Sequence, residues 1–183
     1  ILSNRTFRLN SLDQMDDLQE KETSDIKNIG QFCYVSSWTD DETESIPMWK
    51  MYSSLDSGVR IKLKTNPFKL FENTPESIKE VSVLPVTDES NGVYLKSIIP
   101  IADMMKKGYI CPAAMSNNIL HKVEYTSDPS KLYPKLVTYE GDKFSISLGT
   151  LGIHKNIHWE FQHEWRYILQ FYPVNINQDP NIL

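Results

Sequence analysis

Two stretches of the chain alternate between apolar and polar residues with the period of a β-strand. In Glu164–Tyr172, one set of alternate positions carries Trp165, Tyr167, Leu169 and Phe171, and the other carries Glu164, Arg166, Ile168 and Gln170. In Gly58–Lys64, the alternation separates Val59, Ile61 and Leu63 from Arg60, Lys62 and Lys64. Because successive side chains of a strand point to opposite faces, both stretches are predicted strands. We expect their apolar side chains to be buried together.

Another strand is predicted at Gln31–Trp38, where aromatic residues recur at alternate positions. An acidic loop follows it, and then Pro47, a residue type that is favoured in the first turn of a helix. A short helix starting there would place Met48, Trp49 and Tyr52 on one side.

The remaining patterns predict short elements. Arg5–Asn10, Val81–Pro85 and Leu120–Tyr125 are expected to be strands, Pro67–Phe71 a short helix, and Tyr139–Lys143 the bend of a hairpin. Strands outnumber helices, and the long helical patterns of doubly wound α/β proteins are missing from the sequence. The sequence therefore predicts an α+β fold, with a mainly antiparallel twisted sheet and a few short helices, in a single domain spanning residues 1–183.

Composition narrows the classes of function. The net charge is −5 and the sequence pI is about 5.4, which argues against a surface built to bind phosphates, and a nucleic-acid enzyme is the least supported class. The two cysteines, Cys33 and Cys111, follow no ligand spacing, so we expect free thiols and a cytoplasmic protein. No apolar run is long enough to span a membrane, so no membrane association is expected.

Glu164 and Arg166 are the first candidates for chemistry, because they share one face of a predicted strand. They would either line a cleft or form a structural ion pair, and the two interpretations weigh equally. His154, His158 and His163 lie close in sequence, but they lack the spacing of a zinc motif, so no metal site is expected.

Two further pairs of residues are candidates. Trp49 and Tyr52 are either core aromatics or a platform on which a nicotinamide or nucleobase stacks. Ser36 and Ser37 have no base partner that is evident in the sequence, which gives a serine hydrolase weak support.

Several short motifs occur in a recognisable order. They are Met15–Glu20, Val35–Trp38, Asp40-Asp41, Met48–Tyr52, Gly58–Ile61, Val123–Tyr125, Lys155, Trp159 and Glu160, and His163–Arg166. With these motifs the chain resembles the bacterial domain-of-unknown-function family twenty-nine seventy-one. That family is in turn similar to small ADP-ribosyltransferases, and its members are sometimes placed near defence genes.

The resemblance implies an NAD-dependent ADP-ribosyltransferase-like bacterial protein, a toxin or phage-defence effector that modifies an unidentified protein or nucleic-acid acceptor. By order along the chain, Ser36 or Ser37 is the middle catalytic element and Glu164 the late one. The first element is expected upstream of Ile1. A carboxylate would stabilise the positive charge that develops on the ribose as the nicotinamide leaves.

The resemblance also implies how NAD would be held as the substrate. Trp49 or Tyr52 would stack on the nicotinamide, and Arg166 or Arg8 would pair with the pyrophosphate. The alternative is a non-catalytic ligand-binding or sensor domain in a bacterial defence or regulatory system. The position of Glu164 separates the two: an open cleft beside the aromatic and serine residues favours the enzyme, whereas a buried and fully paired Glu164 favours the binding domain.

Overall fold

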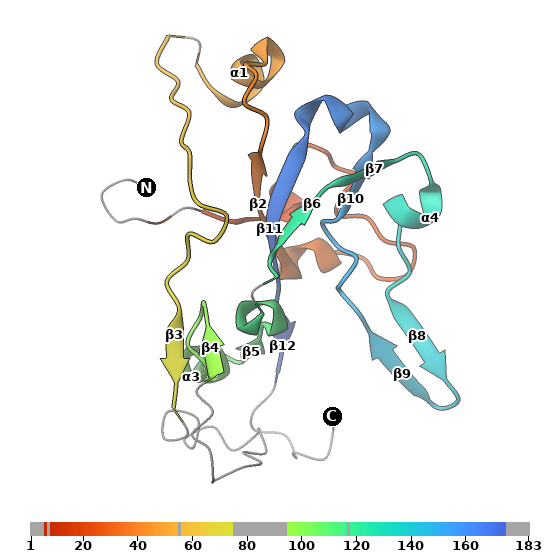
Figure 1. Ribbon diagram of the computed structural model, residues 1–183. Helices are drawn as coiled ribbons and strands as arrows, with labels where there is room; N and C mark the ends of the chain where they lie inside the picture. The colour runs from red at the N-terminus through yellow and green to blue at the C-terminus, as the bar shows by residue number, and fades with distance from the viewer. Residues whose placement is uncertain (1–5, 7, 55, 75–94, 117, 175–183) are drawn as a thin grey trace.

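The centre of the protein is a four-stranded antiparallel sheet with the order β1-β2-β11-β6. Its strands are β1 (Asn10–Ser11), β2 (Cys33–Thr39), β11 (Glu164–Gln170) and β6 (Leu120–Lys122). The structure is a computed structural model that describes residues 6, 8–54, 56–74, 95–116 and 118–174. Figure 1 shows the long strands β2 and β11 side by side at the middle of the molecule. The α+β class with mainly antiparallel pairing is confirmed.

Short elements surround this sheet. The helical ones are η1 (Leu12–Gln14), η2 (Ile29–Phe32), α1 (Ile46–Tyr52), α3 (Ile101–Lys106), η3 (Pro112–Met115), α4 (Pro129–Leu132) and η4 (Ile157–Gln162). The other strands are β3 (Phe71–Asn73), β4 (Leu95–Ser97), β5 (Tyr109–Ile110), β7 (Glu124–Thr126), β8 (Val137–Glu140), β9 (Lys143–Ile146), β10 (His154–Asn156) and β12 (Tyr172–Pro173). They pair as β3–β4, β5–β12, β8–β9 and β7–β10, of which β7–β10 is parallel. Among the described residues, no helix is both long and apolar enough to cross a membrane.

The register of β2 against β11 decides which side chains share a face. Arg166 is opposite Ser37, and Tyr167 is opposite Ser36. Because directly opposed residues in an antiparallel pair lie on the same face, Ser37 is on the face of Glu164 and Arg166, and Ser36 is on the other face.

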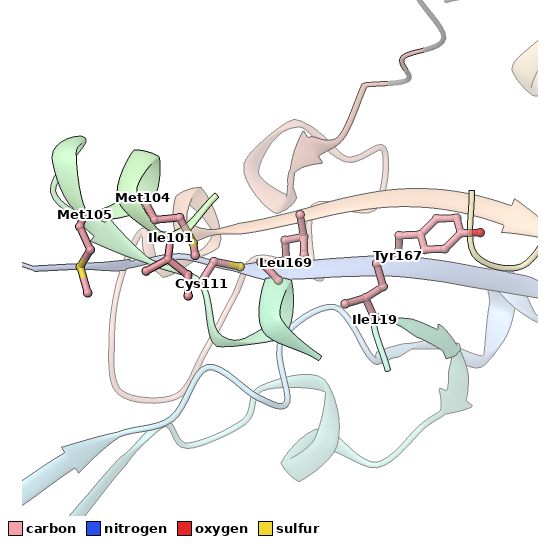
Figure 2. Packing of buried hydrophobic residues seen from close by; sticks show 8 residues of the cluster. Ile101, Met104, Met105, Cys111, Ile119, Tyr167 and Leu169 are labelled. Atoms are coloured by element: carbon pink, nitrogen blue, oxygen red, sulfur yellow. The ribbon is translucent and has the colours of Figure 1, made fainter. Parts of the chain in front are cut away.

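One face of β11 packs on α3 and the segment that follows it. Tyr167 and Leu169 are buried there among Ile101, Met104, Met105, Cys111, Ala114 and Ile119. Figure 2 shows Leu169 beside Cys111, with the side chains from α3 on one side and Tyr167 and Ile119 on the other. Phe171 is partly buried against this cluster, so the predicted burial of the apolar face of β11 is largely confirmed.

The opposite face is also buried, which favours the structural ion pair, one of the two interpretations that the sequence left open. Ile168 packs with Leu12, Cys33, Val35, Leu136, Leu148 and Leu151 in a second apolar cluster. The backbone of Gly152 packs closely against this face. Its φ is +81°, and a Cβ there would lie 3.1 Å from the side chain of Val35. Only glycine adopts this conformation without strain and leaves the space free. The face that carries Glu164 and Arg166 is therefore part of the interior and not the wall of an open cleft.

The predicted strand at Gly58–Lys64 is wrong. This stretch forms no strand, and Val59, Ile61 and Leu63 are 76%, 38% and 43% exposed. In Figure 1 the chain runs here as an extended connection from α1 to β3. Arg60 and Lys62 instead bind the acidic loop, at the carbonyl oxygen and carboxylate of Glu42. Alternation produces a buried strand only when a neighbouring strand pairs with its backbone, and none of the described strands pairs with this stretch.

Some of the other local predictions hold. Of the predicted strand Arg5–Asn10, only Asn10 lies in a strand among the described residues. The helix at Pro47 is α1, and Gly141, with φ of +60°, turns the chain between β8 and β9. The predicted strand Leu120–Tyr125 is divided into β6 and β7, and the helix expected at Pro67–Phe71 is absent. Cys33 and Cys111 are free, as expected, and both are buried. Val81–Pro85 lies outside the described residues.

Candidate functional site

Four charged side chains form a network in the interior. Arg166 donates from Nε to Glu164 Oε1 at 2.5 Å and from Nη2 to Glu164 Oε2 at 3.1 Å, and it also binds Glu20 through Nη1. Lys155 Nζ lies 3.2 Å from Glu164 Oε2 and 3.1 Å from Glu20 Oε1. Arg166 is 0% exposed, Lys155 1%, Glu164 4% and Glu20 8%.

Segments that are distant in the sequence supply these charges. Glu164 and Arg166 come from β11, Lys155 from β10, and Glu20 from the turn that follows η1. Two carboxylates oppose two cations, so the formal charges cancel. Arg166 also donates to the carbonyl oxygen of Gly152 at 3.1 Å. Charges of this kind are tolerated in a protein interior only when they are paired and hydrogen-bonded.

The pairing holds Glu164 and Arg166 in their charged forms. Burial alone raises the pKa of Glu164, but the charge and hydrogen bonds of Arg166, with Lys155 and Ser37, outweigh it and leave the pKa below its ordinary value. For Arg166, burial lowers the pKa, and Glu20 and Glu164 outweigh that effect, so its pKa is raised. Glu164 is therefore an ionised carboxylate whose two oxygens are occupied by cations.

Stability should decline in acid because of this carboxylate. The folded pKa of Glu164 lies below its ordinary value of 4.5, so its contribution is present above about pH 4.5 and disappears as pH falls through the folded pKa. We expect the free energy of unfolding, measured in urea, to decline below about pH 4.5, and less steeply in Glu164→Gln. Equal acid slopes in the two proteins would contradict this coupling.

The aromatic candidates line a cavity beside the network. Trp49 and Tyr52 project from α1 into a space of about 190 Å³. The other lining residues are Thr39, Asp41, Thr43, Glu44, Ser45, Met48, Ser53, Val59, Arg60, Phe161 and Gln162. Phe161 stacks on Trp159, with ring centroids 6.2 Å apart. The cavity thus lies between α1 and η4 and is lined by both apolar and polar residues.

A hydrogen-bonded relay connects the cavity to the buried charges. Tyr52 donates its hydroxyl hydrogen to Asp16 Oδ2 at 2.7 Å, and its oxygen accepts from Gln162 Nε2 at 2.6 Å. Gln162 Oε1 accepts from Lys155 Nζ at 2.8 Å, and Lys155 in turn faces Glu164. The polar groups of Tyr52 and Gln162 in the cavity wall are therefore hydrogen-bonded to the buried network.

The structure brings only one of the two predicted serines to Glu164. Glu164 is buried and paired, and Ser37, which is exposed on the same face, forms a side-chain hydrogen bond to it. Ser36 lies on the opposite face, where its Oγ accepts from Trp38 Nε1 at 3.0 Å. Because a sheet lies between them, Ser36 and Glu164 cannot act on one substrate atom.

The predicted cofactor-binding residues divide in the same way. Trp49 and Tyr52 share the cavity, but Arg166 is fully buried among carboxylates and cannot reach a pyrophosphate. Arg8 is exposed, donates to Gln14 Oε1 at 3.2 Å, and is not part of the cavity wall. The expected pairing of Arg166 or Arg8 with a pyrophosphate has no support in this geometry.

Sequence reasoning missed three residues that shape the site. Glu20 and Lys155 occur among the motifs of the resemblance, and that order was the only signal available for them. Nothing in the sequence marked Gln162 as a site residue, because a glutamine next to a predicted strand is usually an exposed surface residue. Among the described residues, no group of three or more histidine, cysteine, aspartate or glutamate side chains is placed to hold a metal ion.

Comparison with known protein families, with curated proteins and with solved structures found no match for this chain.

Proposed function

We propose that this protein is a non-catalytic ligand-binding or sensor domain of a bacterial defence or regulatory system. The observation that carries the proposal is that Glu164 is buried with both oxygens paired, while Trp49 and Tyr52 line a cavity. The assignment to a defence or regulatory system rests on the resemblance to family twenty-nine seventy-one. The free, buried thiols of Cys33 and Cys111 support a cytoplasmic location.

The pairing of Glu164 favours binding over transfer. To stabilise a developing ribose cation, a carboxylate must face the position that the ribose occupies. Here Arg166 and Lys155 occupy the oxygens of Glu164. Freeing the carboxylate would leave two cations in the interior with one carboxylate, Glu20, which is a large electrostatic cost.

The size and walls of the cavity indicate a small aromatic ligand. About 190 Å³ is below the roughly 300–1,000 Å³ of pockets that enclose drug-sized molecules. It suits a single heterocycle, such as a nucleobase or nicotinamide, and not a whole dinucleotide. Trp49, Tyr52 and Phe161 offer ring faces on which such a heterocycle can stack.

Binding of a heterocycle should depend on Trp49. Stacking on an aromatic side chain contributes roughly 1–3 kcal/mol, so Trp49→Ala is expected to weaken binding of adenine or nicotinamide at least fivefold in calorimetric titrations. Tyr139→Ala is the matched control, because Tyr139 is 70% exposed on the β8–β9 hairpin and outside the cavity. Absence of binding by the unchanged protein, or equal loss in both variants, would refute the proposal.

An NAD-dependent transferase is the second candidate, and one observation favours it. Glu164 is connected to the cavity through two hydrogen-bonded side chains: it accepts from Lys155, which donates to Gln162 in the cavity wall. The test is to incubate the protein with labelled NAD and bacterial lysate and to follow nicotinamide release and label transfer. We expect neither; turnover that disappears in Glu164→Gln would establish the enzyme instead.

A further inference from the structure

We infer that Gln162 is held as a hydrogen-bond donor at the floor of the cavity, and that the cavity selects aromatic rings bearing a carbonyl-type acceptor. This inference rests on the proposed function and names the chemical class of its ligand. The required acceptor is an oxygen or nitrogen lone pair at the edge of the ring.

The orientation of the Gln162 amide follows from its partners. A lysine ammonium has three donors and no acceptor, so the atom that faces Lys155 at 2.8 Å must be the amide oxygen. Lys155 also donates to Glu164 Oε2 at 3.2 Å and forms an ion pair with Glu20 at 3.1 Å, which fixes the ammonium in place. The amide nitrogen of Gln162 is thereby turned towards Tyr52, and both residues line the cavity.

One hydrogen of this nitrogen remains for a ligand. Nε2 carries two hydrogens, and one is donated to the hydroxyl oxygen of Tyr52. Within the part of the chain that the structure describes, the second has no hydrogen-bond partner, although Gln162 is 3% exposed and lines the cavity. A buried N–H without a partner is costly, and an acceptor on the ligand would remove that cost.

Tyr52 does not compete for the role of donor. Its own hydrogen is directed to Asp16. Burial first, and then the hydrogen bond and charge of Asp16, raise the pKa of Tyr52, so the phenol stays protonated and that hydrogen stays with Asp16. Burial raises the pKa of Asp16, but the Tyr52 bond and the charge of Lys155 outweigh it and keep this carboxylate ionised.

The test compares two ligands of nearly the same shape. Acetophenone carries a carbonyl oxygen, and α-methylstyrene carries a CH₂ group at the same position. Calorimetric or fluorescence titration of the unchanged protein is expected to show acetophenone binding about tenfold more tightly, which corresponds to one satisfied hydrogen bond. This comparison uses a single protein, so it does not depend on how any variant folds.

A variant assigns the preference to Gln162. Gln162→Glu keeps an oxygen towards Lys155 but replaces the N–H donor with a carboxylate oxygen, so the preference for acetophenone should disappear. Gln31→Glu adds the same charge at an exposed position outside the cavity and should keep it. A thermal melt of both variants reports whether the fold is retained.

The outcomes separate this inference from the proposed function. Equal binding of the two ligands by the unchanged protein would overturn the donor role of Gln162 and leave the aromatic cavity intact. Failure of both these ligands, adenine and nicotinamide to bind would overturn the proposed function and this inference with it. A tenfold preference that survives in folded Gln162→Glu would show that another group is the donor.

Discussion

Glu164→Gln is expected to lower the free energy of unfolding by about 3–5 kcal/mol, the usual cost of removing one partner from a buried ion pair. The variant keeps the shape of the side chain but leaves Arg166 and Lys155 with one carboxylate, Glu20, in the interior. Urea denaturation at pH 7 measures the effect.

Glu42→Gln is the matched control for this substitution. Glu42 pairs with Lys62 at 3.2 Å, but both side chains are more than four-fifths exposed, at 85% and 89%. Exposed pairs contribute roughly 0–1 kcal/mol, so this variant should remain close to the unchanged protein. The contrast isolates burial from the loss of a charge.

The same Glu164→Gln sample distinguishes the two candidate functions. If Glu164 has only an anchoring role, the melting temperature falls and any activity per folded molecule is unchanged. An unchanged melting temperature together with a hundredfold or greater loss of NAD-dependent transfer would mean that Glu164 acts on substrate. That result would favour the NAD-dependent transferase over the binding domain.

Leu169→Ala is expected to cost about 2–5 kcal/mol, because the substitution leaves a cavity in a packed core. Leu169 is 6% exposed and packs in the cluster that α3 and Cys111 form against β11. Figure 2 shows Leu169 beside Cys111, between the side chains of α3 and Tyr167. The loss should be seen as a lower urea midpoint with little change in slope.

Leu18→Ala provides the comparison for a leucine outside the core. Leu18 is 66% exposed, and surface substitutions usually change stability by less than about 0.5 kcal/mol. Equal effects of the two substitutions would mean that the face of β11 carrying Leu169 is not the packed one.

Local sequence was sufficient for several elements. The period of two in Glu164–Tyr172 predicted β11 and the burial of Tyr167 and Leu169 on one face. Pro47 marked α1, and Gly141 marked the β8–β9 turn. These features depend on backbone preferences and on side-chain period, both of which can be read over a few residues.

Pairing could not be read in the same way. Gly58–Lys64 alternates as well as β11 does, yet it forms no strand. The difference is that β11 has hydrogen-bonded neighbours on both sides, β2 and β6. Which strand gains a neighbour depends on contacts between distant segments, and alternation carries no information about them.

The sequence by itself determined the fold class, the strand that carries Glu164 and Arg166, and the helix that carries Trp49 and Tyr52. Only the tertiary structure decided what those residues face. Glu20 and Lys155 approach β11 from distant parts of the chain and form a buried network of charges with Glu164 and Arg166. The sequence alone allowed this pair to be either the wall of a cleft or a structural ion pair. The physical reason is that burial and ion pairing depend on the distance between atoms in space, and the chain brings these four side chains together only when it folds.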